Sequence, residues 1–119
     1  MPNIYHVDRL YRRKVIGSGS TGETIRLDLD PVKPKTLRVL THVTVENTLN
    51  DYTRVRLGIE NRGQVHYLDE LSSPAKEELA VSRSDILLGE VDVFFAQCVL
   101  TAANNTLEMN AIGWEITLK

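Results

Sequence analysis

Histidine and serine, the residue types that most often carry catalysis, are scattered along this chain. His6, His42 and His66 lack the close spacing of a zinc motif, although adjacent strands can bring His42 and His66 together. The serines belong to no nucleophile-elbow motif, so an acyl-transfer enzyme has no support. We therefore predict a protein that is not an enzyme, with no catalytic residue, no metal site and no cofactor.

Acidic residues gather between positions 69 and 92. Such carboxylates can act as a pair in glycoside hydrolysis or as oxygen ligands for calcium. The Asp-rich loop spacing of a calcium site is absent, so the pattern favours solubility and protection of sheet edges. The residues concerned are Asp69, Glu70, Glu77, Glu78, Asp85, Glu90 and Asp92.

A basic segment near the N-terminus has Tyr11 among Arg9, Arg12, Arg13 and Lys14. Phosphate neutralisation with Tyr11 stacking would suit nucleic acid, but the net charge of −2 and the lack of a second basic-aromatic patch argue against it. Residues 1–40 nevertheless hold eight basic and four acidic residues, and the remainder holds six and twelve. This asymmetry is compatible with a simple solvated surface, or with contacts between copies or docking of these four basic residues on an acidic partner.

The glycine-rich stretch at residues 17–22, GSGSTG, has the spacing of a dinucleotide-binding fingerprint. That motif requires a helix directly after the glycines. Here residues 24–31 alternate between apolar and polar types and predict a strand that ends at Pro31. The stretch is therefore interpreted as a turn.

The most apolar part of the chain, residues 86–100, is predicted to be the single strand around which the others pack. It contains Phe95, which we expect to be buried, and Cys98, the one cysteine, which we expect to behave as a small buried apolar group. Without a second cysteine there is no internal disulfide.

Further strands are predicted from alternating patterns. Residues 36–47 and 53–60 are expected to form a hairpin-like pair, and residues 61–63 a turn before the next strand. Residues 74–81 are interpreted as extended rather than as a helical turn. In the last segment a bulge near Ile112 and Gly113 would keep apolar residues on both sides of it facing inward.

These elements predict an all-β fold: an antiparallel β-sandwich of jelly-roll type, with about seven or eight strands. We expect one domain over residues 1–119, with residues 1–16 as an N-terminal arm or an edge strand. No apolar run is long enough to span a membrane, and the N-terminus lacks a signal-peptide core, so the chain is expected to be soluble and not secreted.

The C-terminal half contains the stretches VHYLDELSSPAKEELAV, ILLGEVDVFFAQ and TLEMNAIGWEITL, the last of which includes the terminal pair Gly113-Trp114. In these stretches it resembles small jelly-roll structural proteins of tailed bacteriophages, such as head-decoration and tail-associated proteins. Residues 89–92, GEVD, depart from the glycine-acid pairing of that family. The resemblance implies a homo-oligomeric virion component that attaches to other virion proteins, assembled in the host cytoplasm.

A carbohydrate-binding β-sandwich module is the alternative. Jelly rolls often present aromatic side chains to sugars on one sheet face, which would require a groove lined by exposed aromatic residues. The candidates are Tyr11, Tyr52 and Tyr67, together with Tyr5 and Trp114. A cupin-like enzyme ranks third, because it would need clustered histidines.

Overall fold

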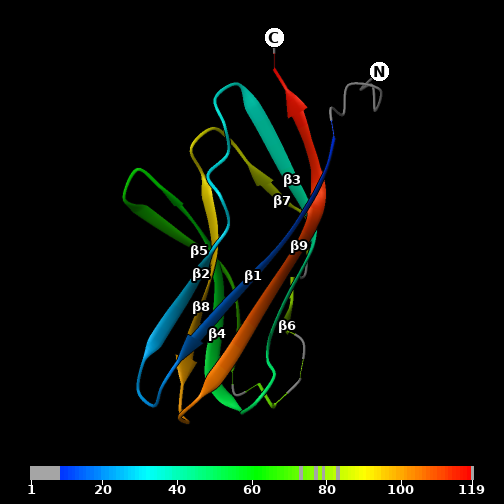
Figure 1. The fold of residues 1–119 in the computed structure, drawn as a ribbon. Coiled ribbons are helices and arrows are strands. Elements are labelled where there is room, and N and C mark those ends of the chain that lie inside the picture. Colours follow the sequence, from blue (N-terminus) through cyan, green and yellow to red (C-terminus); the bar gives the residue numbers. More distant parts are fainter. Residues whose placement is uncertain (1–8, 73, 77, 79, 83, 119) are drawn as a thin grey trace.

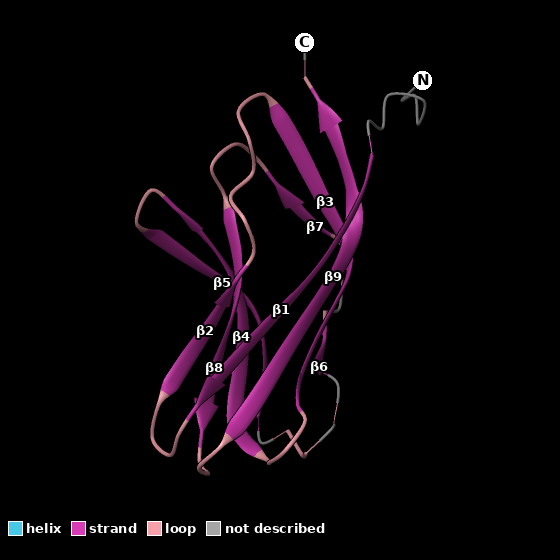
Figure 2. Ribbon diagram, in the orientation of Figure 1, coloured by secondary structure: helices cyan, strands magenta, loops and turns pink. Residues whose placement is uncertain are grey.

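Alternating residues build nine strands in the part of the chain that the computed structural model describes, residues 9–72, 74–76, 78, 80–82 and 84–118 (Figure 1). In chain order they are β1 (Arg9–Gly19), β2 (Thr24–Asp28), β3 (Thr36–Asn47), β4 (Tyr52–Asn61), β5 (Gln64–Ser72), β6 (Ala80–Val81), β7 (Ile86–Leu88), β8 (Val93–Leu100) and β9 (Asn105–Thr117). Loops join the strands, and these residues form no helix (Figure 2). A helix long and apolar enough to cross a membrane is accordingly not found among them.

The strands form two antiparallel sheets, called sheet A and sheet B below. Sheet A has five strands in the order β1-β9-β3-β6, with β7 also paired to β3, and sheet B has four in the order β2-β8-β4-β5. The two strand orders match position by position, β1 with β2, β9 with β8 and β3 with β4. They match because the connections β1–β2, β8–β9 and β3–β4 each cross from one sheet to the other. The fold is thus an antiparallel β-sandwich of jelly-roll type, which confirms the predicted fold class.

The hydrophobic core lies between the two sheets. Burial raises the pKa of the Cys98 thiol to about 12, so Cys98 is a protonated apolar group at neutral pH. The strands that face each other across the core contribute most of it, through Val43, Val45, Val55, Leu57, Phe94, Ala96, Cys98, Leu100, Leu107, Met109 and Ala111.

The prediction of one strand over residues 86–100 is wrong. β7 ends at Leu88 in sheet A, and β8 begins at Val93 in sheet B. In the turn between them Val91 has a φ of 62°, and Asp92 accepts a hydrogen bond from the backbone N–H of Gly89 at 2.7 Å. Both pieces are apolar because both line the core, so the break is not visible in the hydrophobic pattern.

The predicted pairing of residues 36–47 with 53–60 is also wrong, because β3 belongs to sheet A and β4 to sheet B. Residues 48–51 cross between the sheets. Asn47, fully buried at the end of β3, stabilises the crossing: its side-chain oxygen accepts the N–H groups of Leu49 and Asn50, each at 3.1 Å. A side chain that satisfies the backbone of a turn competes with the hydrogen bonds of a hairpin.

The turn predicted at residues 61–63 is confirmed. It joins β4 to β5, and Arg62 and Gly63 both have positive φ, as a tight two-residue hairpin turn requires. The tip of this hairpin splays away from the neighbouring strands (Figure 1), and residues 64–68 are exposed.

The predicted bulge near Ile112 and Gly113 lies in the other strand of the pair. β3 shifts its register against β9 between Leu40 and His42, whereas β9 keeps its alternation from Asn105 to Glu115. The apolar side chains that follow Gly113 therefore lie on the outer face of sheet A and not in the core.

The backbone of β3 approaches β9 closely at Gly113. A Cβ atom on this residue would lie 1.8 Å from the backbone oxygen of Val39 and 2.9 Å from the Cα of Leu40. Only glycine fits such a contact, which explains why the bulge stands opposite this position.

At the N-terminus, residues 1–8 of the predicted arm lie outside the described residues. From Arg9 onward the chain forms β1, which pairs with β9 and with no other described strand. β1 is thus an edge strand of sheet A.

Replacing Gly113 with alanine should lower the free energy of unfolding by about 3 kcal/mol, because the backbone of β3 must move to admit the methyl group. Gly89→Ala is the matched control. A Cβ there meets nothing closer than Asp92 Oδ2 at 3.7 Å, so we expect a change within about 0.5 kcal/mol. Urea unfolding measures both variants, and equal values would contradict the close approach at Gly113.

Candidate functional site

The basic segment on β1 is divided by the alternation of the strand. Arg9 and Arg13 lie on the inner side of sheet A with Tyr11, where they form ion pairs, and Arg12 and Lys14 lie on the outer side and are exposed. The four predicted docking residues therefore do not form a single patch, because successive side chains on a strand point to opposite faces.

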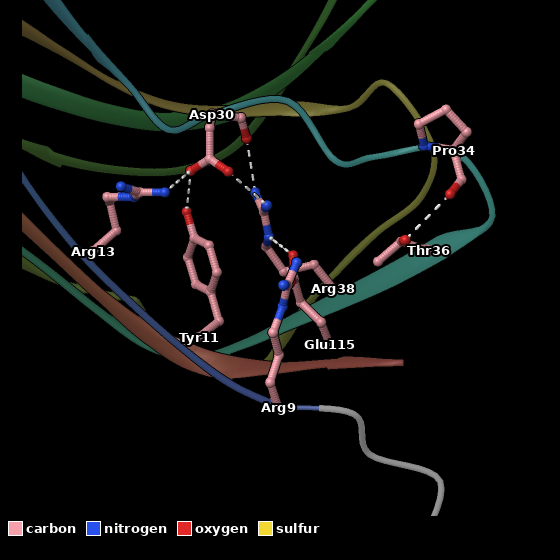
Figure 3. Close-up of polar contacts among 8 residues, drawn as sticks. All are labelled: Arg9, Tyr11, Arg13, Asp30, Pro34, Thr36, Arg38 and Glu115. Carbon is pink, nitrogen blue, oxygen red and sulfur yellow. Dashed lines mark hydrogen bonds and ion pairs between the residues drawn. The ribbon is translucent and has the colours of Figure 1, made fainter. Parts of the chain in front are cut away.

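Arg38 of β3 is the centre of the polar network that holds Arg9 and Arg13 (Figure 3). Its side chain is almost fully buried. The guanidinium donates to Glu115 Oε2 at 2.8 Å, to Asp30 Oδ2 at 3.0 Å and to the backbone oxygen of Asp30 at 2.7 Å. Arg9 adds a bond to Glu115 Oε1 at 2.6 Å, and Arg13 approaches Asp30 Oδ1 at 3.2 Å.

Tyr11 completes this network and does not face solvent. Its hydroxyl donates to Asp30 Oδ1 at 2.7 Å, and the Arg38 guanidinium lies 4.0 Å from the centre of its ring. Burial, reinforced by the bond to Asp30, raises the pKa of Tyr11 to about 12. Tyr11 was a predicted ligand contact, and with 6% of its surface exposed it offers no ring face to a ligand.

Both carboxylates of the network are stabilised in the ionised form. Burial opposes the charge on Asp30, but the bond from Tyr11 and the charge of Arg38 outweigh it and lower its pKa. Burial also opposes the charge on Glu115, where the bonds from Arg9 and Arg38 prevail and lower its pKa. Both groups are therefore held as carboxylates at neutral pH, and the bonds from Arg38 to Asp30 tie the β2–β3 loop to sheet A.

Tyr52, the second predicted contact, is 2% exposed and sits in the core. Burial raises its pKa. The prediction that Tyr11 and Tyr52 contact a ligand is therefore wrong, because both rings face inward between the sheets.

Tyr67 of β5 is the predicted aromatic residue that does lie on a surface, with half of it exposed. It lies on the outer face of sheet B, where its ring meets the ring of Phe95 edge to face, with centroids 5.9 Å apart. Its hydroxyl bonds to Gln97 Oε1 at 3.3 Å, and the guanidinium of Arg56 lies 4.8 Å from the ring centre. These three contacts fix the orientation of an accessible ring.

A bulge in β5 brings Glu70 onto the face of Tyr67. Leu57 pairs with Asp69 and Gly58 with Tyr67, so Leu68 is an extra residue in the ladder. Because of it, Tyr67 and Glu70 share one face although their positions differ by an odd number. Alternation alone does not reveal the bulge.

Gly58 makes room for the two aromatic rings. It stands between Tyr67 and Phe95 in the sheet, and a Cβ on it would lie 2.7 Å from Phe95 Cζ. Phe95 is 1% exposed, as predicted, but it belongs to the outer face, where the Arg26 guanidinium covers it at 4.2 Å from the ring centre.

Charged pairs surround these rings. Arg26 contacts Asp28 and Glu60, each at 2.6 Å, and Arg56 contacts Glu70 at 2.6 Å. A shallow depression of about 320 Å³ lies beside the ring and is lined by Arg56, Tyr67, Asp69 and Glu70. We call Arg26, Arg56, Glu60, Tyr67, Glu70, Phe95 and Gln97 the Tyr67 face.

The remaining chemically active residues are not brought together. His42 lies on β3 of sheet A and His66 on β5 of sheet B, and His6 lies outside the described residues. Glu77 is also outside them, and Asp92 is used in a turn. Over the described ranges, no group of three His, Cys, Asp or Glu residues is placed to hold a metal ion.

Neither protein-family models nor curated protein sequences match this chain. Among solved structures it is similar to a protein described as an α-L-fucosidase from Bacteroides thetaiotaomicron, with a TM-score of 0.50 and 7% identity. That likeness covers 82% of this chain and 21% of the other, so the chain spans about a fifth of that protein's length. At this identity the similarity is one of fold.

Two carbohydrate-binding modules are also similar. A family 29 module has a TM-score of 0.46 at 11% identity, over 86% of this chain and 65% of its own. A family 16 module has a TM-score of 0.41 at 11% identity, over 76% of this chain and 70% of its own. These scores are lower, and no conclusion about function follows from them.

The buried network yields a prediction about pH. Glu115→Gln leaves Arg38 without its buried charged partner and should cost about 3–5 kcal/mol at neutral pH. Because folding lowers the pKa of Glu115 below its ordinary 4.5, its ionised form stabilises the fold above that pH, and the stabilisation is lost as the pH falls below it. The variant should therefore lose less stability than the parent between about pH 5 and pH 3.

Glu108→Gln is the control for this experiment, because Glu108 lies on the same strand with its side chain on the outer face. Its free energy of unfolding should stay within about 0.5 kcal/mol of the parent's. If the free energy of unfolding in urea depends on pH equally in the parent and in Glu115→Gln, the fold does not hold Glu115 in its ionised form.

Proposed function

We propose that this chain is a non-enzymatic carbohydrate-binding module that binds a polysaccharide on the Tyr67 face. The observation that carries the proposal is the half-exposed Tyr67 ring, fixed by Phe95, Gln97 and Arg56 on the outer face of sheet B. The proposal rests on this face and not on the similarity to solved structures.

The chemistry of the face matches that of a sugar ring. A pyranose has an apolar C–H surface, which packs on an aromatic ring, and hydroxyl groups at its rim, which need donors and acceptors. Guanidinium groups offer several N–H donors and carboxylates several lone pairs, so Arg26, Arg56, Glu60 and Glu70 keep free positions after pairing with each other.

The shape of the face favours a polymer over a small molecule. The depression beside Tyr67 is shallow and opens on a sheet surface, so it covers one side of a ligand and does not enclose it. Since the ring and the charged groups are already held by one another, a ligand would lose little free energy in ordering them.

The pairing of these carboxylates with arginines favours binding without hydrolysis. A glycosidase needs one carboxyl that stays protonated near neutral pH. On this face Glu70 pairs with Arg56, which lowers the pKa of Glu70, and Glu60 pairs with Arg26. The virion role implied by the phage resemblance stays a prediction, because nothing in the described residues bears on it.

Tyr67→Ala should reduce binding to the preferred polysaccharide by about tenfold, because the stacking surface is lost while the fold remains. Affinity electrophoresis in gels that contain soluble xylan, β-glucan, mannan or galactan, and pull-down on cellulose and chitin, measure the effect. Leu68→Ala is the matched control: Leu68 has the same exposure, 49% against 50%, and lies next to Tyr67 in β5. It should bind like the parent.

Two outcomes would overturn this proposal. The first is that none of these polysaccharides retards or retains the parent protein. The second is that retention occurs but is lowered equally by Tyr67→Ala and Leu68→Ala, or by neither, which would move binding away from the Tyr67 face.

A further inference from the structure

The outer face of sheet A carries a row of apolar side chains across four strands. The strand registers place Leu10 of β1 beside Trp114 of β9, Trp114 beside Val39 of β3, and Val39 beside Leu87 of β7. Leu10 is 68% exposed and Leu87 is 63% exposed. Adjacent apolar side chains on a sheet face form one continuous surface, which a monomer rarely leaves open to water.

The surface extends on both sides of this row. Leu37 pairs with Ile116 on one side, and Ile112, 46% exposed, lies on the other. We call Leu10, Leu37, Val39, Leu87, Ile112, Trp114 and Ile116 the sheet A patch.

Alternation makes the patch apolar. Arg38 and Glu115 face inward in the buried network, so their neighbours Leu37, Val39, Trp114 and Ile116 must face outward. Since the interior of this end of the sandwich is polar, the apolar side chains that would ordinarily form a core here lie on the surface.

The charged residues of the same outer face indicate what covers the patch. Arg12 and Lys14 lie on β1 next to it, and Glu46 pairs with Glu108 further along β3 and β9. None of these four side chains forms an ion pair within the described part of the chain, in contrast to Arg9, Arg13 and Arg38. One face thus presents unpaired basic and acidic groups at separate places.

We propose that the sheet A patch is the contact surface between two copies of this chain. A face that carries both signs of charge beside an apolar centre complements itself, because a two-fold axis can set the basic strand of one copy against the acidic pair of the other. A partner of uniform charge would leave one of the two groups facing its own sign. The apolar centre supplies the burial that holds the pair together.

Trp114, the one tryptophan of the chain, reports directly on this contact. In a dimer through the sheet A patch its indole is removed from water, so its fluorescence maximum should shift to shorter wavelength as the protein concentration rises. Over the same concentrations the mass from sedimentation velocity should rise from 13.4 kDa toward twice that value.

Leu10→Lys tests the surface without a change in the core, because Leu10 is mostly exposed on an edge strand. It should raise the dimer dissociation constant by about tenfold or more. Leu49→Lys is the matched control, since Leu49 is 50% exposed and lies on the β3–β4 connection. It should dimerise as the parent does, and both variants should melt near the parent temperature.

Three results would overturn the inference. One is a monomer at every concentration, and this includes the case in which the chain's own residues 1–8 cover Trp114. Another is a dimer in which Leu10→Lys and Leu49→Lys behave alike, and the third is a dimer whose formation leaves Trp114 emission unchanged. Because the Tyr67 face is on the other sheet, these results are independent of polysaccharide binding.

Discussion

The ion pair between Arg38 and Glu115 sits on the inner side of sheet A, where a sandwich normally has hydrocarbon. A buried charge without a partner is very unfavourable, so every element around the pair has to bring it a polar group. β1 supplies Arg9 and Tyr11, and the loop after β2 supplies Asp30 (Figure 3). The same pair decides which residues of β3 and β9 face water, and thereby the character of the outer surface.

Much of the fold can be predicted from the sequence, because alternation fixes a strand wherever one face is apolar. The class of fold, the strand over residues 36–47 and the turn at residues 61–63 follow from local patterns. The assignment of strands to sheets does not. A chain that crosses from one sheet to the other remains apolar on both sides of the crossing, so residues 86–100 resemble one strand, although the turn at Val91 divides them.

Only part of the Tyr67 face can be predicted from the sequence. Tyr67 is predictable as a surface aromatic residue, but Tyr11 and Tyr52 have the same local appearance and are buried. What separates them is the partner strand: Tyr67 pairs with Gly58 on the outer face of sheet B, and the bulge at Leu68 then brings Glu70 onto the same face. Gly58, a glycine in the middle of an otherwise regular strand, is the signal that points to a close approach there.

The two outer faces of the sandwich look in opposite directions, because each sheet turns its inner side toward the common core (Figure 1). If two copies meet through sheet A, their two Tyr67 faces point away from each other and cannot lie along one polymer strand. A dimer of this kind gains no affinity by binding one polymer molecule at both of its Tyr67 faces. It acts instead as a bridge between separate polymers, so its effect would appear in the viscosity or gelation of a polysaccharide solution.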